Sequence, residues 1–94
     1  MRAMENPKSI LITGASSGIG QALALSYAAS DSFLTLNGRN AERLKMIADQ
    51  CRARGATVYT CLVDVTNAEA MNEWIVEANN KHPLDLVIAN AGIS

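Results

Sequence analysis

An excess of charge of one sign is missing from this sequence, and so are long apolar runs. Its 94 residues carry eight Lys and Arg against nine Asp and Glu, a formal net charge of −1. There is no basic excess to bind a nucleic-acid backbone or an anionic membrane. No apolar run approaches the roughly 18 residues of a membrane span. Because Glu5 and Pro7 interrupt the opening MRAMENPKSILIT, we expect that it is not a signal peptide. We expect a cytoplasmic protein that binds neither nucleic acid nor membrane.

Cysteine and histidine are also scarce. Cys51 and Cys61 are too few for a disulfide framework, and neither has a second Cys or a His at metal-ligand spacing. We expect both to be buried reduced thiols, because free Cys packs as a small hydrophobic residue. His82, the single histidine, is expected to be an exposed loop residue. The sequence therefore predicts no metal site.

Length and composition favour one small folded domain spanning 1–94. The chain is 49% hydrophobic and 18% charged, which argues against disorder. A compact chain of this length has a radius of gyration of about 12 Å. It can bury only a modest core, because the buried fraction falls with chain length.

Short apolar runs alternate with amphipathic stretches along the whole chain. The apolar runs predict four strands, at Ser9–Thr13, Phe33–Asn37, Thr57–Val63 and Leu86–Ala89. The stretches between them predict three helices, at Gly18–Ala29, Ala41–Arg54 and Asn67–Asn80.

Capping residues support the ends of these helices. Asn40 is expected to cap the second helix and Gly55 to end it. Thr66, with Glu69 three residues later, predicts a capping box at the start of the third helix.

The order β-α-β-α-β-α-β predicts an α/β fold of the Rossmann type. Strands that alternate with helices imply right-handed crossovers and a parallel sheet. The expected strand order is 3-2-1-4, which reverses between strands 1 and 4. Ligands of such sheets bind at the carboxyl ends of the strands, beside that reversal.

A glycine-rich turn, Thr13 to Gly20, lies at this point of the predicted sheet. Gly14 allows a tight turn, Gly18 lets backbone N–H groups reach an anion, and Gly20 allows the helix to pack closely. The hydroxyls of Ser16 and Ser17 lie beside the anion. A helix N-terminus at this position favours a phosphate. The alternative is a glycine-rich turn without a ligand. A phosphate-binding loop of the GK[ST] kind is excluded, because no Lys follows the glycines.

The sequence TGASSGIG, at GxxxGxG spacing, resembles the cofactor motif of the short-chain dehydrogenases/reductases. Further family motifs follow the other three strands: Arg39 after the second, Asp64-Val65 after the third, and Asn90-Ala91-Gly92 after the fourth. The resemblance extends from about Lys8 to Ser94. It implies that these residues form part of an NAD(P)-binding Rossmann domain.

The resemblance also implies a role for each matching residue. The cofactor pyrophosphate and ribose would be lined by Gly14, Ser16, Gly18, Ile19 and Gly20. The Asp64 carboxylate would accept the adenine amino group, and the backbone of Val65 would support the ring. Near the cofactor ribose, the sheet would carry Asn90, Ala91 and Gly92. Two alternatives stay open: Asp64 as an N-terminal charge for the next helix, and Asn90 as a turn residue.

The cofactor preference can be argued from charge. A site for NAD(H) needs an acid at the end of the second strand, to hold the ribose hydroxyls. That position holds Gly38, followed by Arg39, and the next carboxylate along the chain is Glu42. A guanidinium binds a 2′-phosphate in a bidentate manner, and Ser16 can add a hydroxyl. We therefore expect NADP(H) to be preferred over NAD(H), a solvated loop arginine being the alternative.

The catalytic residues of the family are missing from this chain. Family members use a Ser and a Tyr-x-x-x-Lys group, but Asp31 and Val63 stand four residues after the two tyrosines. We expect the N-terminal part of an NADP-dependent oxidoreductase that moves hydride between nicotinamide and a carbonyl or alcohol. The 94 residues alone would be inactive. The alternative is a complete, non-catalytic nucleotide-binding module. The apolar edge of the fourth strand, Leu86–Ala89, predicts self-association.

Overall fold

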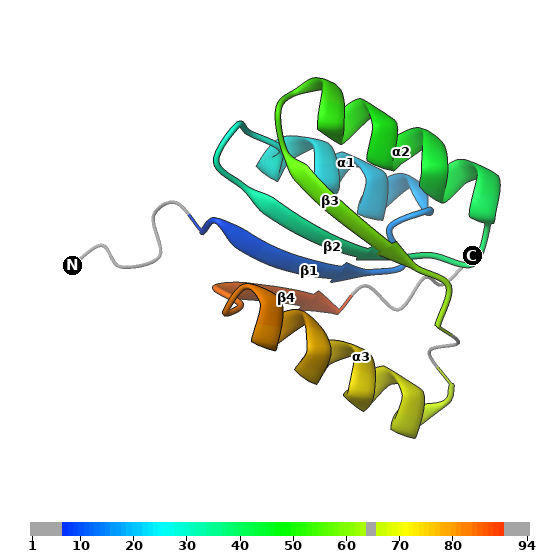
Figure 1. Ribbon diagram of the computed structural model, residues 1–94. Helices are drawn as coiled ribbons and strands as arrows, with labels where there is room; N and C mark the ends of the chain where they lie inside the picture. The colour runs from blue at the N-terminus through cyan, green and yellow to red at the C-terminus, as the bar shows by residue number, and fades with distance from the viewer. Residues whose placement is uncertain (1–6, 64–65, 90–94) are drawn as a thin grey trace.

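A computed structural model describes residues 7–63 and 66–89 of the chain. Its seven elements alternate as predicted (Figure 1). The strands are β1 (Ser9–Thr13), β2 (Phe33–Asn37), β3 (Thr57–Cys61) and β4 (Leu86–Ala89). The helices are α1 (Gly18–Tyr27), α2 (Ala41–Ala53) and α3 (Ala68–Lys81). The main departures from the predicted bounds are the ends of α1 and β3, each two residues earlier than predicted.

The four strands form one parallel sheet in the order β3-β2-β1-β4, which confirms the predicted topology. Central strand β1 pairs with β2 from Ser9 to Ile12, and with β4 from Ile10 to Thr13. Helices α1 and α2 cover one face of the sheet, and α3 lies on the other (Figure 1). The order therefore reverses at β1, beside the glycine-rich turn.

The core lies on both faces of β1, all five residues of which are buried. Ile10 and Ile12 belong to the larger cluster, beneath α1 and α2. Leu11 points to the opposite face and packs with Trp74 and Ala78 of α3. Burying one such aliphatic side chain stabilises the fold by about 1.5–3 kcal/mol. This two-sided burial explains why the three middle residues of β1, Ile10 to Ile12, are all apolar rather than alternating.

Most of the helix ends agree with the sequence. The Asn40 side chain accepts the N–H of Arg43 and caps α2. Gly55 ends this helix with φ of 94°, the left-handed region. The N–H groups of Gly55 and Ala56 donate to the carbonyls of Arg52 and Cys51, which forms a Schellman motif.

The predicted cap of α3 is wrong by one residue. Asn67, not Thr66, is the N-cap, and its side chain accepts the N–H of Ala70 at 3.0 Å. Asn and Ser or Thr are comparable caps, so sequence alone did not distinguish these neighbours.

No helix among the described residues is long and apolar enough to cross a membrane.

The scarce residues differ in part from expectation. Cys51 is a buried free thiol, as predicted, but Cys61 is only half-buried at the end of β3. His82 is also half-buried, and its ring stacks on Phe33 with 3.8 Å between centroids. The expectation of an exposed histidine is therefore wrong, because β2 brings an aromatic ring next to the end of α3.

An aspartate fastens the amino ends of β1 and β4. The Asp85 carboxylate accepts the backbone N–H groups of Lys8 at 2.8 Å and of Ser9 at 3.0 Å. These hydrogen bonds lower the pKa of Asp85, because they favour its ionised form. The Lys8 side chain pairs with Asp31 at 2.8 Å, which lowers the pKa of that carboxyl in the same way.

We predict that acid removes the stabilisation from Asp85. Its folded-state pKa lies below the unfolded value of about 3.9. The contribution is therefore present above that value and is lost as pH falls through the folded pKa. In urea unfolding, Asp85→Asn should be less stable than the parent at pH 7, and the gap should narrow towards pH 2. Glu73→Gln, an exposed carboxylate on α3, is the control. A gap that is constant with pH would contradict this account.

Candidate functional site

The glycine-rich turn between β1 and α1 has the geometry that its sequence predicts. Gly14 has φ of 66°, the left-handed region that favours glycine. A Cβ on Gly20 would overlap the carbonyl oxygen of Gly14 and lie 2.7 Å from Cα of Ala15. A Cβ on Gly18 would meet nothing within 4 Å, so this glycine faces open space. Gly20 is thus required for packing, whereas Gly18 leaves the backbone accessible.

The start of α1 has the polarity that favours an anion. Ser17 is the N-cap, and its hydroxyl oxygen accepts the N–H of Gly20 at 3.1 Å. The same hydroxyl donates to the carbonyl of Gly14 at 2.9 Å. Helical geometry leaves the N–H groups of Gly18 and Ile19 without acceptors inside the helix. No acidic residue lies in the first turn of α1 to oppose an anion.

Two contacts join this turn to the end of β2 and the residues that follow it. The Ala15 N–H donates to the carbonyl of Asn37 at 2.6 Å. The Ser16 hydroxyl oxygen accepts the backbone N–H of Arg39 at 3.3 Å. A Cβ on Gly38 would lie 2.9 Å from that hydroxyl oxygen, so the chain passes close to Ser16. The structure therefore brings Ser16 and Arg39, two residues predicted from separate motifs, to one place.

Two polar residues near this junction were not singled out by the sequence. Arg43, on the first turn of α2, donates from Nη1 to the carbonyl of Ser16 at 3.4 Å. Arg43 lies off the buried face of α2 and is exposed. The buried Asn37 donates its amide to the carbonyl of Val63 at 2.7 Å, so it holds the chain after β3 beside the end of β2. The position of Asn37, an amide at the end of a mostly apolar strand, is the sequence signal that could have identified it.

The other predicted site residues are only partly placed. Ile19 is 69% exposed beside Gly18 and is free to contact a ligand. Asp64 and Val65, predicted for adenine, lie outside the described residues, as do the three predicted residues after β4: Asn90, Ala91 and Gly92. Their roles stay predictions. In the part of the chain that the structure describes, no cluster of His, Cys, Asp and Glu could hold a metal ion.

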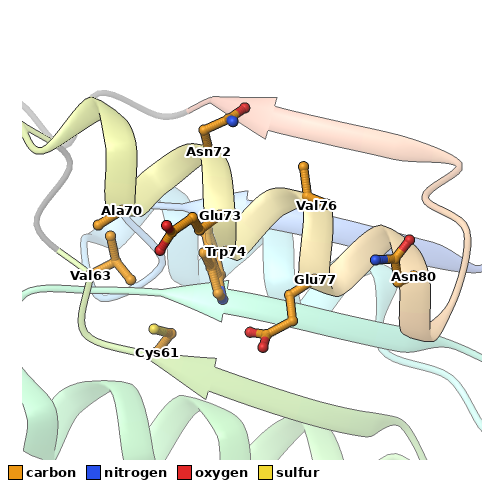
Figure 2. A pocket seen from close by; sticks show the side chains of 9 residues that line it. All are labelled: Cys61, Val63, Ala70, Asn72, Glu73, Trp74, Val76, Glu77 and Asn80. Atoms are coloured by element: carbon orange, nitrogen blue, oxygen red, sulfur yellow. The ribbon is translucent and has the colours of Figure 1, made fainter.

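A hollow of about 640 Å³ lies between α3 and the end of β3, on the face of the sheet opposite α1 (Figures 1 and 2). Figure 2 shows Trp74 pointing from α3 towards the sheet, above Cys61. Two carboxylates, Glu73 and Glu77, line the hollow, and none of its described lining residues is a cation. A phosphate would be repelled here, whereas the start of α1 attracts one. Charge therefore favours the glycine-rich turn over this hollow for an anionic ligand.

Comparison with known proteins gives one family. The family model described as short chain dehydrogenase matches residues 8–94. The chain is 38% identical over 91 residues to the 11-beta-hydroxysteroid dehydrogenase-like 4A of Arabidopsis thaliana, covering 95% of this chain and 30% of that protein. It is 39% identical over 84 residues to the gluconate 5-dehydrogenase of Gluconobacter oxydans, covering 88% of this chain and 33% of that enzyme.

Solved structures agree with these relatives. The glucose dehydrogenase of Caenorhabditis elegans, in its apo form, superposes with a TM-score of 0.77 at 34% identity, covering 88% of this chain and 37% of that one. A xylitol dehydrogenase with bound NAD+ gives a TM-score of 0.77 at 28% identity, covering 85% and 31%. The chain thus spans about a third of the length of the relatives that it matches.

Two glycine substitutions should separate packing from ligand access. Gly20→Ala should lower the free energy of unfolding by about 1–3 kcal/mol, because its methyl group meets the backbone of Gly14 and Ala15. Gly18→Ala should leave that free energy within about 1 kcal/mol of the parent, because its methyl group enters open space. Urea unfolding measures both. Equal effects of the two substitutions would refute the assigned difference.

Proposed function

The chain belongs to the short-chain dehydrogenase family, and on that premise we propose a specific role for it. It is the N-terminal dinucleotide-binding portion of an NADP-dependent oxidoreductase. The parent protein transfers hydride between the nicotinamide and a carbonyl or alcohol substrate. The bound dinucleotide supplies the hydride chemistry. In this proposal residues 1–94 form part of one Rossmann domain, and their task is to bind and orient the cofactor.

The observation that carries the proposal is the junction at Ser16. This residue belongs to the phosphate-binding turn, and its hydroxyl holds the backbone of Arg39 at 3.3 Å. A dinucleotide with its pyrophosphate at the start of α1 would bring its adenosine ribose towards the end of β2. Asp64, Val65, Asn90, Ala91 and Gly92 are proposed to complete the site on the adenine and nicotinamide sides.

Charge and space at the end of β2 both favour NADP(H). The position that an NAD-binding acid would occupy holds Gly38, where even a Cβ would press on Ser16. Next to it stands Arg39, which is exposed and able to bind a 2′-phosphate. The Ser16 hydroxyl lies within reach of the same group. The site thus offers a cation and a hydroxyl where an NAD site would offer a carboxylate.

Arg39→Ala should weaken NADP binding by about 1.5–3 kcal/mol, the usual strength of a hydrogen bond to a charged group. NAD binding should change little, because NAD lacks the 2′-phosphate. Titration calorimetry with both cofactors measures the difference. Lys45→Ala is the control, since Lys45 lies farther along α2 and pairs with Asp49 at 3.1 Å. Equal or tighter binding of NAD by the parent chain would refute the cofactor preference.

Catalysis is proposed to need residues outside this chain. It carries neither the Ser nor the Tyr-x-x-x-Lys group of the family, so we expect the 94 residues alone to bind cofactor without turning over substrate. The second candidate is a non-catalytic nucleotide-binding module of this length. The intact mass of the natural protein separates the two. A mass close to 10 kDa would favour the module.

We also propose that the isolated chain self-associates through β4. Within the described residues β4 pairs with β1 on one side only. Val87 on β4 is 48% exposed, and Val76 on neighbouring α3 is 50% exposed. The opposite edge is partly covered, because the Arg52 guanidinium donates to the carbonyl of Val58 in β3 at 2.9 Å. An apolar edge strand favours pairing with a second copy.

Sedimentation of the isolated chain should show a mass that rises with concentration. Val87→Lys should shift the chain towards monomer, because a charge on an edge strand opposes pairing. Thr57→Lys, on the opposite edge strand, should leave the association unchanged. A parent chain that stays monomeric at high concentration would rule out self-association.

A further inference from the structure

Arg43 contacts the same residue, Ser16, that holds the backbone of Arg39. Its Nη1 lies 3.4 Å from the carbonyl oxygen of Ser16, whose hydroxyl holds the backbone of Arg39. We propose that Arg43 is a second specificity residue, which binds the 2′-phosphate of adenosine together with Arg39. This inference rests on the proposed function, since it requires a dinucleotide at the glycine-rich turn.

The backbone of Arg43 is held in the cap of α2, while its side chain is exposed. Its N–H donates to the Asn40 side chain at 3.0 Å, in the cap of α2. The guanidinium is exposed, and its contact with Ser16 is long and ends on a neutral carbonyl. A phosphate oxygen is a stronger acceptor for a guanidinium than a neutral carbonyl is. A phosphate beside Ser16 should therefore draw Arg43 from that carbonyl at little cost.

The charge of the segment gives Arg43 a reason to take part. Between Arg39 and Arg43 there is one carboxylate, Glu42, in the first turn of α2. Arg39 and Glu42 together carry no net charge. With Arg43 the segment has a net charge of about +1, which suits a phosphate. Without Arg43, the segment that faces the phosphate would carry no net charge.

The competing interpretation is a structural tie. In that case the contact with Ser16 only stabilises the glycine-rich turn. Its loss would then weaken the binding of every ligand of that turn to the same extent. A 2′-phosphate role instead predicts a loss confined to ligands that carry this group. The ratio of the affinities for phosphorylated and unphosphorylated ligands therefore separates the two.

The test is titration calorimetry of the chain with NADP, NAD, 2′,5′-ADP and 5′-ADP. Arg43→Ala should lower the affinity for NADP and 2′,5′-ADP about tenfold. It should lower the affinity for NAD and 5′-ADP less than about twofold. Arg43→Lys should recover part of the loss, because it restores the charge without the bidentate geometry. Arg54→Ala is the matched control: Arg54 also donates to a backbone carbonyl, that of Leu25 at 2.8 Å, but from the far end of α2.

The possible results test the cofactor preference and the role of Arg43 separately. If the parent chain binds NADP and NAD equally, the proposed cofactor preference fails, and the role of Arg43 falls with it. If the parent prefers NADP but Arg43→Ala weakens all four ligands alike, Arg43 is a structural tie and the inference is overturned. No change in any affinity overturns it as well. A selective loss that Arg54→Ala does not reproduce supports it.

Discussion

The contact between the glycine-rich turn and the segment after β2 is the constraint on which the site depends. It needs the left-handed φ of Gly14, the close approach at Gly20 and the hydrogen bond from Ala15 to Asn37. These features carry Ser16 to the end of β2, where its hydroxyl receives the N–H of Arg39. The turn at the start of α1 and the arginine that follows β2 thereby become one surface. The parallel pairing of β1 with β2 keeps that surface in register.

Electrostatics then separates this surface from the rest of the molecule. The start of α1 offers the positive end of a helix with no acid in its first turn. The hollow beside α3 lies on the other face of the sheet and is lined by two carboxylates (Figures 1 and 2). The net charge of −1 does not disfavour an anion at this surface, because two arginines, Arg39 and Arg43, lie beside Ser16.

Sequence reasoning predicted the elements and their order because period, caps and turn glycines are local signals. It was less successful where the outcome depends on distant neighbours. His82 was expected to be exposed but stacks on Phe33, which only the sheet brings close. Arg43 is not singled out by the sequence, because helical periodicity carries no information about its contact with the neighbouring turn. The N-cap of α3 is Asn67 rather than the predicted Thr66. Both residue types can cap a helix, so the sequence does not distinguish them.

The central claim is that the glycine-rich turn and the start of α2 form one site for an adenosine bisphosphate. Titrating 2′,5′-ADP into the ¹⁵N-labelled chain and following the amide resonances tests it directly. The account predicts saturable shifts concentrated in two segments, Ser16–Gly20 and Gly38–Arg43, with smaller shifts for 5′-ADP in the second segment. Shifts centred on the hollow at Trp74 and Glu77, or no saturable shift at millimolar ligand, would contradict it.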